Sequence, residues 1–274
     1  MARIDEEALA EAYNRALALE KAGEFDAAAL AYQDVLAIDP EDHGGAAVRL
    51  AAMGRGETPP RAPDAYVETL FDQHAEDFED ILVEQLGYAV PMMVRQKLQS
   101  LSLGPFKRML DLGCGTGLTG AALRDMAADI TGIDLSENMV EITHEKDIYE
   151  TLYVAEVEDF LEDNDDEAFD LITATDVLPY LGALEPLFFG SAENMVEGAI
   201  LAFSSEAMAE DDAHDLPYKV GPHQRFMHKE SYIRERLAAT GFEILDIEEI
   251  NVRMQDGAPS PGHLVIARKR KDNF

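Results

Sequence analysis

The stretch MLDLGCGTGLTG, residues 109–120, decides how the centre of this chain folds. An apolar run, then closely spaced glycines, then a helical pattern is typical of a strand that turns sharply into a helix. Two glycine patterns overlap in it. Gly115, Gly117 and Gly120 spell G-x-G-x-x-G, which cradles the pyrophosphate of dinucleotides. The second pattern, D-x-G-x-G-x-G, begins at Asp111 and places a carboxylate beneath the same loop.

Asp111 distinguishes between the two patterns. In a dry site a carboxylate would repel a pyrophosphate by several kcal/mol, whereas it would attract an ammonium group beside a sulfonium. The loop therefore favours S-adenosylmethionine, with S-adenosylhomocysteine as product, over a nicotinamide dinucleotide. None of the nine tyrosines is followed by lysine four residues later, so the catalytic pair of short-chain dehydrogenases is missing. An NAD(P)-dependent oxidoreductase remains the alternative that cofactor titrations would separate.

From Tyr66 onward, short apolar runs alternate with helical segments. This alternation predicts a doubly wound, Rossmann-like α/β fold with a mostly parallel sheet. The last two apolar runs have no helix between them, so we expect them to pair as an antiparallel hairpin at the sheet edge. The seven expected strands lie near residues 108–112, 130–133, 152–154, 171–175, 199–204, 243–250 and 263–268.

Residues 1–60 are expected to form a small all-α segment with a linker, and residues 61–274 the cofactor-binding domain. The first segment is alanine-rich, and GETPPRAP at residues 56–63 interrupts its helical spacing. Gly23, Ala28 and Tyr32 fall where a tetratricopeptide repeat places its turn and packing residues, as do Phe25 and Pro40. One repeat is too few to stand alone, so the segment should cap its own domain, a second copy or a protein partner.

Composition narrows the partners. The chain has 22 basic and 55 acidic residues, a net charge of −33, which repels nucleic acid and anionic membrane surfaces. No apolar run approaches the roughly 20 residues of a membrane helix, and the acidic N-terminus is unlike a signal peptide. The single cysteine, Cys114, excludes an internal disulfide and a cysteine-rich metal site. We expect a cytoplasmic protein with a small-molecule substrate and no metal.

Two acids follow the next predicted strands. Asp134 ends ITGID, 17 residues after Gly117, where a carboxylate can accept both hydroxyls of a ribose. Glu156 follows YVA and is placed to accept from an adenine amino group, with Val157 against the ring. This spacing is typical of a nucleoside site.

MLDLGCGTG, GIDLSENMV and FDLITATDVLPYLG resemble signature segments of class I S-adenosylmethionine-dependent methyltransferases. The resemblance covers residues 66–269. With YVETLFDQHAEDFE and PHQRFMHKESYIRERLAATGFEIL, the chain resembles a bacterial subfamily that carries an N-terminal tetratricopeptide segment. The resemblance implies a methionine site at Asp111, Gly113, Cys114, Gly115 and Gly117, a ribose site at Asp134, an adenine site at Leu135, Met139, Glu156 and Val157, and a methyl-group border at Thr175 and Asp176.

Candidates for the chemistry lie after the fourth and fifth strands. The run VGPHQRFMHKESY supplies His223 and His228 as possible bases, and Arg225 to bind a carboxylate-bearing substrate, in a loop expected to lead into a helix. Asp176 is a third catalytic candidate. The substrate side is expected to include Tyr180, Phe71 on a possible lid helix, and His74, which either lines that side or contacts the cofactor carboxylate.

The resulting hypothesis is methyl transfer from S-adenosylmethionine to the O, N, S or C atom of a small molecule by in-line displacement. Two alternatives stay open: a protein methyltransferase that recruits its target through residues 1–60, and a cofactor-binding scaffold without turnover. DVLPYL lacks the adjacent prolines of enzymes that methylate nucleic-acid bases, which weighs against that substrate class.

Overall fold

The computed structural model describes residues 5–165, 167–212 and 216–271. None of the described helices is long and apolar enough to span a bilayer. The helices are α1 (Glu6–Lys21), α2 (Phe25–Ile38), α3 (Ala46–Ala52), α4 (Asp64–His74), the π-helix η1 (Asp80–Gln85), α5 (Val90–Ser100), α6 (Leu118–Leu123), α7 (Glu137–Glu145), α8 (Val157–Asp163), the 3₁₀ turn η2 (Leu178–Tyr180), α9 (Glu185–Glu193) and α10 (Glu230–Ala239). The strands are β1 (Phe106–Leu112), β2 (Ala127–Asp134), β3 (Thr151–Val154), β4 (Phe169–Ala174), β5 (Met195–Ala207), β6 (Tyr218–Val220), β7 (Phe226–His228), β8 (Phe242–Gln255) and β9 (Ala258–Lys269).

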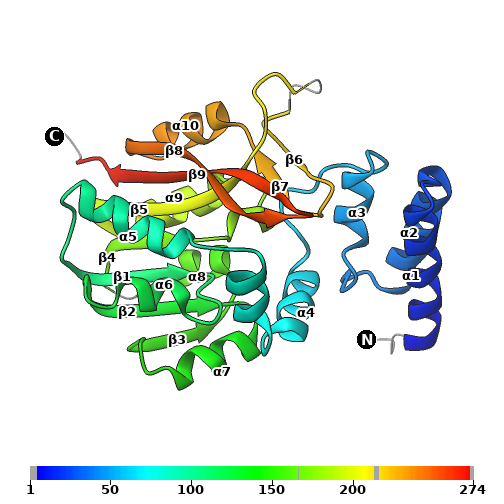
Figure 1. Ribbon diagram of the computed structural model, residues 1–274, viewed down its shortest axis with the longest axis horizontal. Coiled ribbons are helices and arrows are strands. Elements are labelled where there is room, and N and C mark those ends of the chain that lie inside the picture. Colours follow the sequence, from blue (N-terminus) through cyan, green and yellow to red (C-terminus); the bar gives the residue numbers. More distant parts are fainter. Residues whose placement is uncertain (1–4, 166, 213–215, 272–274) are drawn as a thin grey trace.

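The strands of the described ranges form one nine-stranded sheet. Its order is β3-β2-β1-β4-β5-β7-β6, and β9 pairs with both β5 and β8 (Figure 1). The pairs from β3 to β5 are parallel, whereas β9 runs antiparallel to β5 and to β8. The expected doubly wound sheet with its antiparallel C-terminal hairpin is confirmed. The short hairpin β6–β7 adds two strands to the expected seven, and it occupies the segment that we expected to be a loop.

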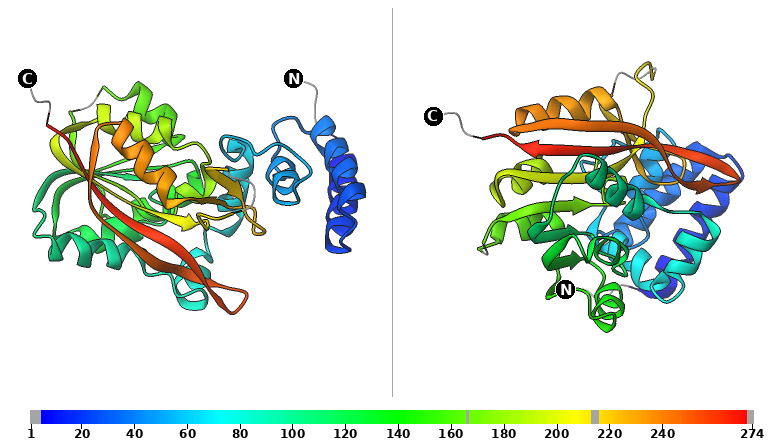
Figure 2. Two further views of the ribbon diagram at one scale, coloured as in Figure 1. Left: turned by 90° about the horizontal axis from the view of Figure 1, so that it is seen from above. Right: turned by 60° about the vertical axis from the view of Figure 1, so that its left-hand side comes forward.

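Helices cover both faces of the sheet (Figure 2). Successive residues of one strand face opposite cores: Leu110 packs with side chains of α8, α9 and α10, whereas its neighbour Met109 packs with α5 and α6. In the adjacent strand, Ile172 and Leu171 divide in the same way. Because both faces are covered, the central strands are apolar throughout, as parallel strands between two helical layers are.

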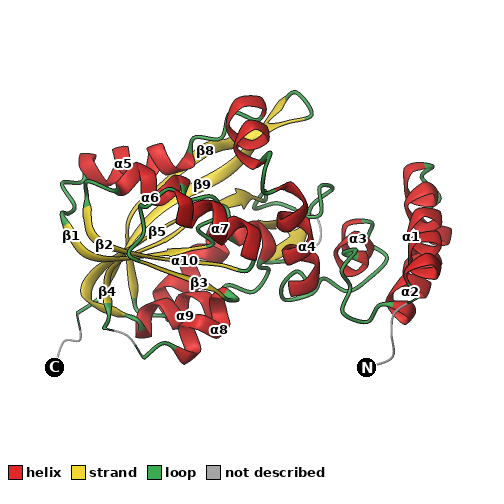
Figure 3. Cartoon of the chain, turned by 90° about the horizontal axis from the view of Figure 1, so that it is seen from below, coloured by secondary structure: helices red, strands yellow, loops and turns green. Residues whose placement is uncertain are grey.

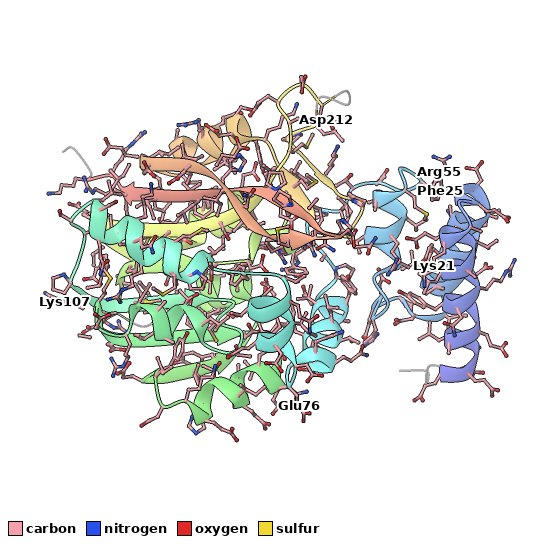
Figure 4. The ribbon with its side chains drawn as sticks, viewed as in Figure 1. Lys21, Phe25, Arg55, Glu76, Lys107 and Asp212 are labelled. Atoms are coloured by element: carbon pink, nitrogen blue, oxygen red, sulfur yellow. The ribbon has the colours of Figure 1, made fainter. Side chains whose placement is uncertain are left out.

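The N-terminal helices stand beside this domain (Figure 3). Ala28 and Tyr32 are fully buried among α1, α2 and α3, whereas Phe25 remains 43% exposed. Figure 4 places Phe25 close to Arg55 at one end of the molecule, far from Lys107. Contact with the domain is made by α3, whose Val48 packs in a cluster with residues of β6 and β7. The N-terminal segment is thus a helical hairpin, α1 and α2, followed by α3, which packs against the domain. Its assignment as a tetratricopeptide repeat stays a prediction.

The linker that follows α3 is fixed to the domain. The carbonyl of Pro60 accepts hydrogen bonds from the backbone N–H groups of Gly182 and Ala183, each at 2.8 Å. The N–H of Ala62 donates to the carbonyl of Tyr180 at 2.8 Å, and Arg61 forms an antiparallel bridge with Leu181. These backbone bonds make the linker part of the structure around the end of β4.

Candidate functional site

A cleft lies at the carboxyl ends of β1 to β4, where ligands bind in open α/β sheets. It holds about 890 Å³ of empty space, part of it open to solvent. The linker, α4 and η1 form its outer wall. The predicted site residues that line it are Phe71, Gly113, Cys114, Gly115, Asp134, Leu135, Glu156, Val157, Thr175, Asp176 and Tyr180.

The glycine loop has a backbone that side chains would not allow. Gly113, Gly115 and Gly117 have φ values of 61°, 54° and 87°, in the left-handed region that favours glycine. A Cβ on Gly113 would also lie 2.5 Å from Val177 Cγ2, so the loop packs directly on the segment after β4. A Cβ on Gly120 would lie 2.3 Å from the Tyr149 ring. Gly120, the last glycine of the dinucleotide pattern, therefore makes room for a tyrosine.

Asp111 lies beneath the glycine loop and is not among the residues that line the cleft, so its expected contact with the cofactor stays a prediction. Its side chain is fully buried, and its two oxygens accept from the hydroxyls of Thr173 and Tyr149, both at 2.6 Å. The Tyr149 hydroxyl in turn accepts from the N–H of Gly120 at 3.0 Å. Burial raises the pKa of Asp111 to about 6, although both hydroxyl hydrogen bonds oppose the shift. From this position the charge of Asp111 would act electrostatically on a ligand in the cleft.

Asp134 is the carboxylate that faces the cleft beside the glycine loop. One oxygen accepts from the N–H of Gly115 at 2.8 Å and the other from the N–H of Ser136 at 2.9 Å. Burial raises its pKa, and these backbone bonds oppose the shift. Each oxygen has a second lone pair for a ligand. Asp134 and Asp111 are called the glycine-loop acids below; among the described residues neither has a lysine, arginine or histidine partner.

The third acid, Glu156, caps the helix α8. Its Oε2 accepts from the N–H groups of Glu158 and Asp159 at 2.8 and 2.9 Å, and lies 3.1 Å from Nη1 of Arg61. Arg61 also pairs with Asp64 at 3.1 Å and with Glu158 at 3.4 Å. Burial, together with the neighbouring Glu156, raises the pKa of Glu158 to about 7. The linker thus supplies a cation to this corner of the cleft.

The strand-four side of the cleft consists of Thr175, Asp176 and Tyr180 together with Tyr88. Asp176 has a φ of 63°, and its N–H donates to Oγ of Ser204 at 3.1 Å. The Tyr88 hydroxyl is hydrogen-bonded to the Thr175 side chain, and burial raises the pKa of both tyrosines. Ring contacts continue from Tyr180 to Phe71 at 5.3 Å between centroids.

Two polar contacts fasten the outer wall over the glycine loop. Asp72 of α4 accepts from Oγ of Ser136 at 2.5 Å. Glu79, just before η1, accepts from Oγ1 of Thr116 at 2.7 Å and from Nζ of Lys146. Both contacts join the outer wall to residues beside the glycine loop, and a lid role of α4 stays a prediction.

Comparison with known proteins identifies the family. Residues 61–247 match the family described as a methyltransferase domain. The chain belongs to this family. The methyltransferase domain takes S-adenosylmethionine as its cofactor, and it begins at the arginine that the linker carries into the cleft.

Curated relatives include two described as ubiquinone biosynthesis O-methyltransferases. The protein of Idiomarina loihiensis is 27% identical over 150 residues, which are 48% of this chain and 60% of the relative. The protein of Coxiella burnetii (strain RSA 493) is 29% identical over 101 residues, which are 36% of this chain and 43% of the relative. The chain thus spans less than two thirds of the length of these relatives.

Solved structures share the fold. A structure described as the [4+2]-cyclase SpnF has a TM-score of 0.61 at 18% identity, with 78% of this chain and 99% of that chain covered. An S-adenosylmethionine-dependent methyltransferase from Clostridium acetobutylicum has a TM-score of 0.55 at 16% identity, with 74% and 100% covered. At this identity the likeness shows the fold alone, and the fold serves more than one reaction.

Several predicted residues lie outside the cleft of the methyltransferase domain. His74 is exposed, and its Nδ1 lies 2.7 Å from the carbonyl of Leu70 in its own helix. Met139 is fully buried in α7 and does not line the cleft. Gly117 lies at the start of α6 and is not among the residues that line the cleft. None of these three residues lines the cleft, and their expected ligand contacts stay predictions.

The histidines of the hairpin β6–β7 are also outside the cleft, so its geometry gives no support to their expected catalytic role. His223 lies in the turn, with a 39% exposed side chain, 3.6 Å from the carboxylate of Asp256. His228 is fully buried, stacked on Tyr232, and its Nε2 lies 3.2 Å from the carbonyl of Gly182. Burial lowers its pKa to about 4. An inward-facing strand residue of this kind serves packing.

Arg225 does not line the cleft either, because it is already paired. Its Nε lies 2.5 Å from Oε1 of Glu206, and its Nη2 donates to Oε1 of Gln255 at 2.8 Å.

The residues at the site that the sequence did not predict are Arg61, Tyr88, Tyr149 and Arg253. Only Arg61 had a local signal, since it stands beside prolines in the linker; the other three reach the site through tertiary contacts.

Proposed function

We propose that this protein transfers a methyl group from S-adenosylmethionine to a small-molecule acceptor. The observation that carries the proposal is Asp134: a buried carboxylate oriented by two backbone N–H groups, with lone pairs left toward the cleft. A ribose diol is the group that such a carboxylate binds best, since two hydroxyls can donate to its two oxygens. We also propose that the chain divides at residue 60 into a helical segment and this domain.

The charge of the cleft supports a cationic cofactor. Asp64, Asp134, Glu156 and Asp176 line it, and the lining cation, Arg61, is occupied by acids. The glycine-loop acids have no cationic partner among the described residues, so a positive ligand would gain their attraction in a medium of low dielectric. A dinucleotide would bring two further negative charges to the same place.

S-adenosylmethionine supplies, when bound, a methyl group activated by positive sulfur. The chain supplies the rest: Asp134 would accept from the ribose, Leu135 and Val157 would contact the adenine, and Glu156 would accept from its amino group. The wall formed by α4 and η1 would limit the access of water and help to hold the reactants in line, which is the main demand of a displacement at carbon.

The test is calorimetry of the full chain with S-adenosylhomocysteine and with NADH. Asp134→Asn should weaken S-adenosylhomocysteine about 10- to 100-fold, because hydrogen bonds to a charged group contribute about 1.5–3 kcal/mol. Asp129→Asn, at the opposite end of β2 and paired with Arg108 at 3.7 Å, is the matched control and should bind normally. Tight binding of NADH, or an unchanged affinity of Asp134→Asn with an unchanged melting temperature, would contradict the proposal.

Turnover is tested with S-adenosylmethionine labelled in its methyl group and an extract of small metabolites. Label in a small molecule supports the proposed reaction, whereas binding without transfer would identify a cofactor-binding scaffold. A second candidate, a protein methyltransferase, is favoured by the exposed Phe25 and Leu30 of α2, which are 43% and 66% exposed. Leu30→Glu alters that face without touching α3, and it should reduce protein labelling only if α2 recruits the target.

A further inference from the structure

We propose that Arg253 of β8 holds the carboxylate of Asp176 in place, and that Asp176 binds the O–H or N–H group of an acceptor that carries no carboxylate. This inference rests on the proposed methyl transfer and names the acceptor class for the same cleft. It assigns Arg253 as a positioning residue, 77 residues from its partner in the sequence.

The pair is arranged with the cation behind and the carboxylate in front. Nη2 of Arg253 donates to Oδ1 of Asp176 and lies 3.4 Å from Oε1 of Glu206. The Arg253 side chain is 4% exposed and does not line the cleft, whereas the Asp176 side chain is 17% exposed and does. One carboxylate oxygen is therefore fixed by the guanidinium, and the proposal assigns the other oxygen to the acceptor.

The backbone of Asp176 supports a functional role. Its φ of 63° lies in the left-handed region, which costs a non-glycine residue free energy and persists only where surroundings enforce it. Here the N–H of Asp176 donates to Ser204 of β5, and the Arg253 pair fixes the side chain. Val177, the next residue, packs where a Cβ on Gly113 would lie. Contacts with β5, β8 and the glycine loop thus fix the segment that carries this carboxylate.

The charges around the pair are balanced. Asp176 and Glu206 face the guanidinium groups of Arg253 and Arg225, and Gln255 accepts from Arg225. Neither arginine lines the cleft, so neither offers a charge to an incoming anion. An acceptor with a carboxylate would find Asp176 in front of it and no unpaired cation among the cleft-lining residues described. We therefore expect such acceptors to be disfavoured on the strand-four side of the cleft.

The remaining walls of the strand-four side suit a neutral or cationic acceptor with an apolar body. Phe71 and Tyr180 form an aromatic corner, and Tyr88 closes the inner side. Aromatic faces bind flat apolar groups and cations, and they give an anion nothing. A hydroxyl or amine on such a body can donate to Asp176.

The reaction balances with these groups alone. The lone pair of the acceptor oxygen or nitrogen forms the new bond to the methyl carbon, the carbon–sulfur bond breaks, and sulfur keeps its electron pair. The acceptor proton passes to the Asp176 carboxylate and then to water. The products are the methylated acceptor, S-adenosylhomocysteine and one proton.

The acceptor class is tested with the wild-type chain. A metabolite extract is separated on an anion exchanger into a bound fraction and a flow-through of neutral and cationic compounds, and each is incubated with methyl-labelled S-adenosylmethionine. We expect the label in the flow-through fraction. Label chiefly in the bound fraction overturns the inference and leaves the methyl transfer standing; no label in either fraction contradicts the methyl transfer itself.

The role of Arg253 is tested by a double-mutant cycle of Asp176→Asn and Arg253→Met, assayed at limiting flow-through fraction. We expect Asp176→Asn to lower the initial rate about 100-fold, as loss of a group that takes the acceptor proton does. Arg253→Met should lower it about 10-fold alone and less than twofold in the Asp176→Asn background, because it acts through Asp176. Arg253→Lys should restore part of the loss.

The affinity for S-adenosylhomocysteine and the melting temperature are measured for every variant. We expect affinities within threefold of wild type. Losses that multiply in the double variant would mean that Arg253 is merely structural, and a parallel loss of cofactor affinity in Asp176→Asn would place that residue on the cofactor; either overturns the inference. If Arg253→Met alone fails to fold, the double variant removes both charges, and its comparison with Asp176→Asn still decides.

Discussion

The two sides of the cleft treat their carboxylates differently. The glycine-loop acids, Asp111 and Asp134, are held by hydroxyl and backbone N–H groups that carry no net charge. On the strand-four side, Asp176 is held by a guanidinium, and Glu206 behind it by two. One side keeps its negative charge uncompensated, and the other is neutral. The difference indicates that the positive charge of a cofactor would gain most beside the glycine loop, where the carboxylates have no cationic partner among the described residues.

The largest effect expected on the glycine-loop side comes from Tyr149→Phe. Its hydroxyl donates to Asp111 and accepts from the N–H of Gly120, so its loss leaves a buried carboxylate and a buried donor each short of a partner. Unfolding in urea should show a loss of about 3 kcal/mol. Tyr153→Phe, four residues on and 38% exposed, is the control. An equal effect in both variants would mean that this side does not depend on neutral donors.

A second prediction concerns pH. Burial raises the pKa of Asp111 to about 6, so its ionisation costs folding energy as pH rises from the ordinary value of 3.8 through 6. The contribution of Asp111 to the free energy of unfolding is therefore fully present at low pH, and it is lost as the pH rises through the folded-state pKa. Asp111→Asn does not titrate, so its stability relative to wild type should rise by about 2 kcal/mol between pH 4.5 and 7.5.

Urea unfolding of both proteins across that pH range measures the difference directly, and titrations common to both proteins cancel. A constant difference would show that Asp111 is compensated after all, and the contrast between the two sides would then disappear. Saturating S-adenosylhomocysteine should reduce the difference, since its ammonium group would favour the ionised carboxylate.

The smallest expected effect tests whether the acceptor chemistry belongs to the strand-four side of the cleft. His223→Gln should leave the rate of methyl transfer and the affinity for S-adenosylhomocysteine within twofold of wild type, because His223 lies in an exposed turn outside the cleft. Rates measured beside Asp176→Asn give the scale. A tenfold loss in His223→Gln would return the acceptor chemistry to the hairpin β6–β7 and move it away from Asp176.

Short-range patterns predicted the glycine-loop side well. Glycines that need a positive φ, and an acid at the end of the next strand, are set by a few residues of sequence, and both line the cleft. The hydrogen bond of Asp111 with the hydroxyl of Tyr149, 38 residues later, was not predicted. No spacing in the sequence predicts this contact, since only the folded sheet brings the Tyr149 hydroxyl to Asp111.

The strand-four side was harder to predict from the sequence, because its contacts also join residues that are far apart in the chain. Asp176 is recognisable after its strand, but Arg253 lies 77 residues away on the long strand β8. The hairpin β6–β7 was expected to be a loop because YKV and FMH are too short to stand out as strands. The burial of Phe226 and His228 on either side of the less buried Met227 is the alternation that a strand produces, and it turns His228 into the core.

The linker has a consequence for how the molecule can change. Inserting residues into a surface loop ordinarily costs little, because closure entropy grows slowly with length. The backbone of residues 60–62 is bonded to the turn after β4, and Arg61 pairs with Glu156. A longer or shorter linker would move the guanidinium of Arg61 away from Glu156. An insertion or deletion in the linker would therefore change which nucleoside the cleft binds.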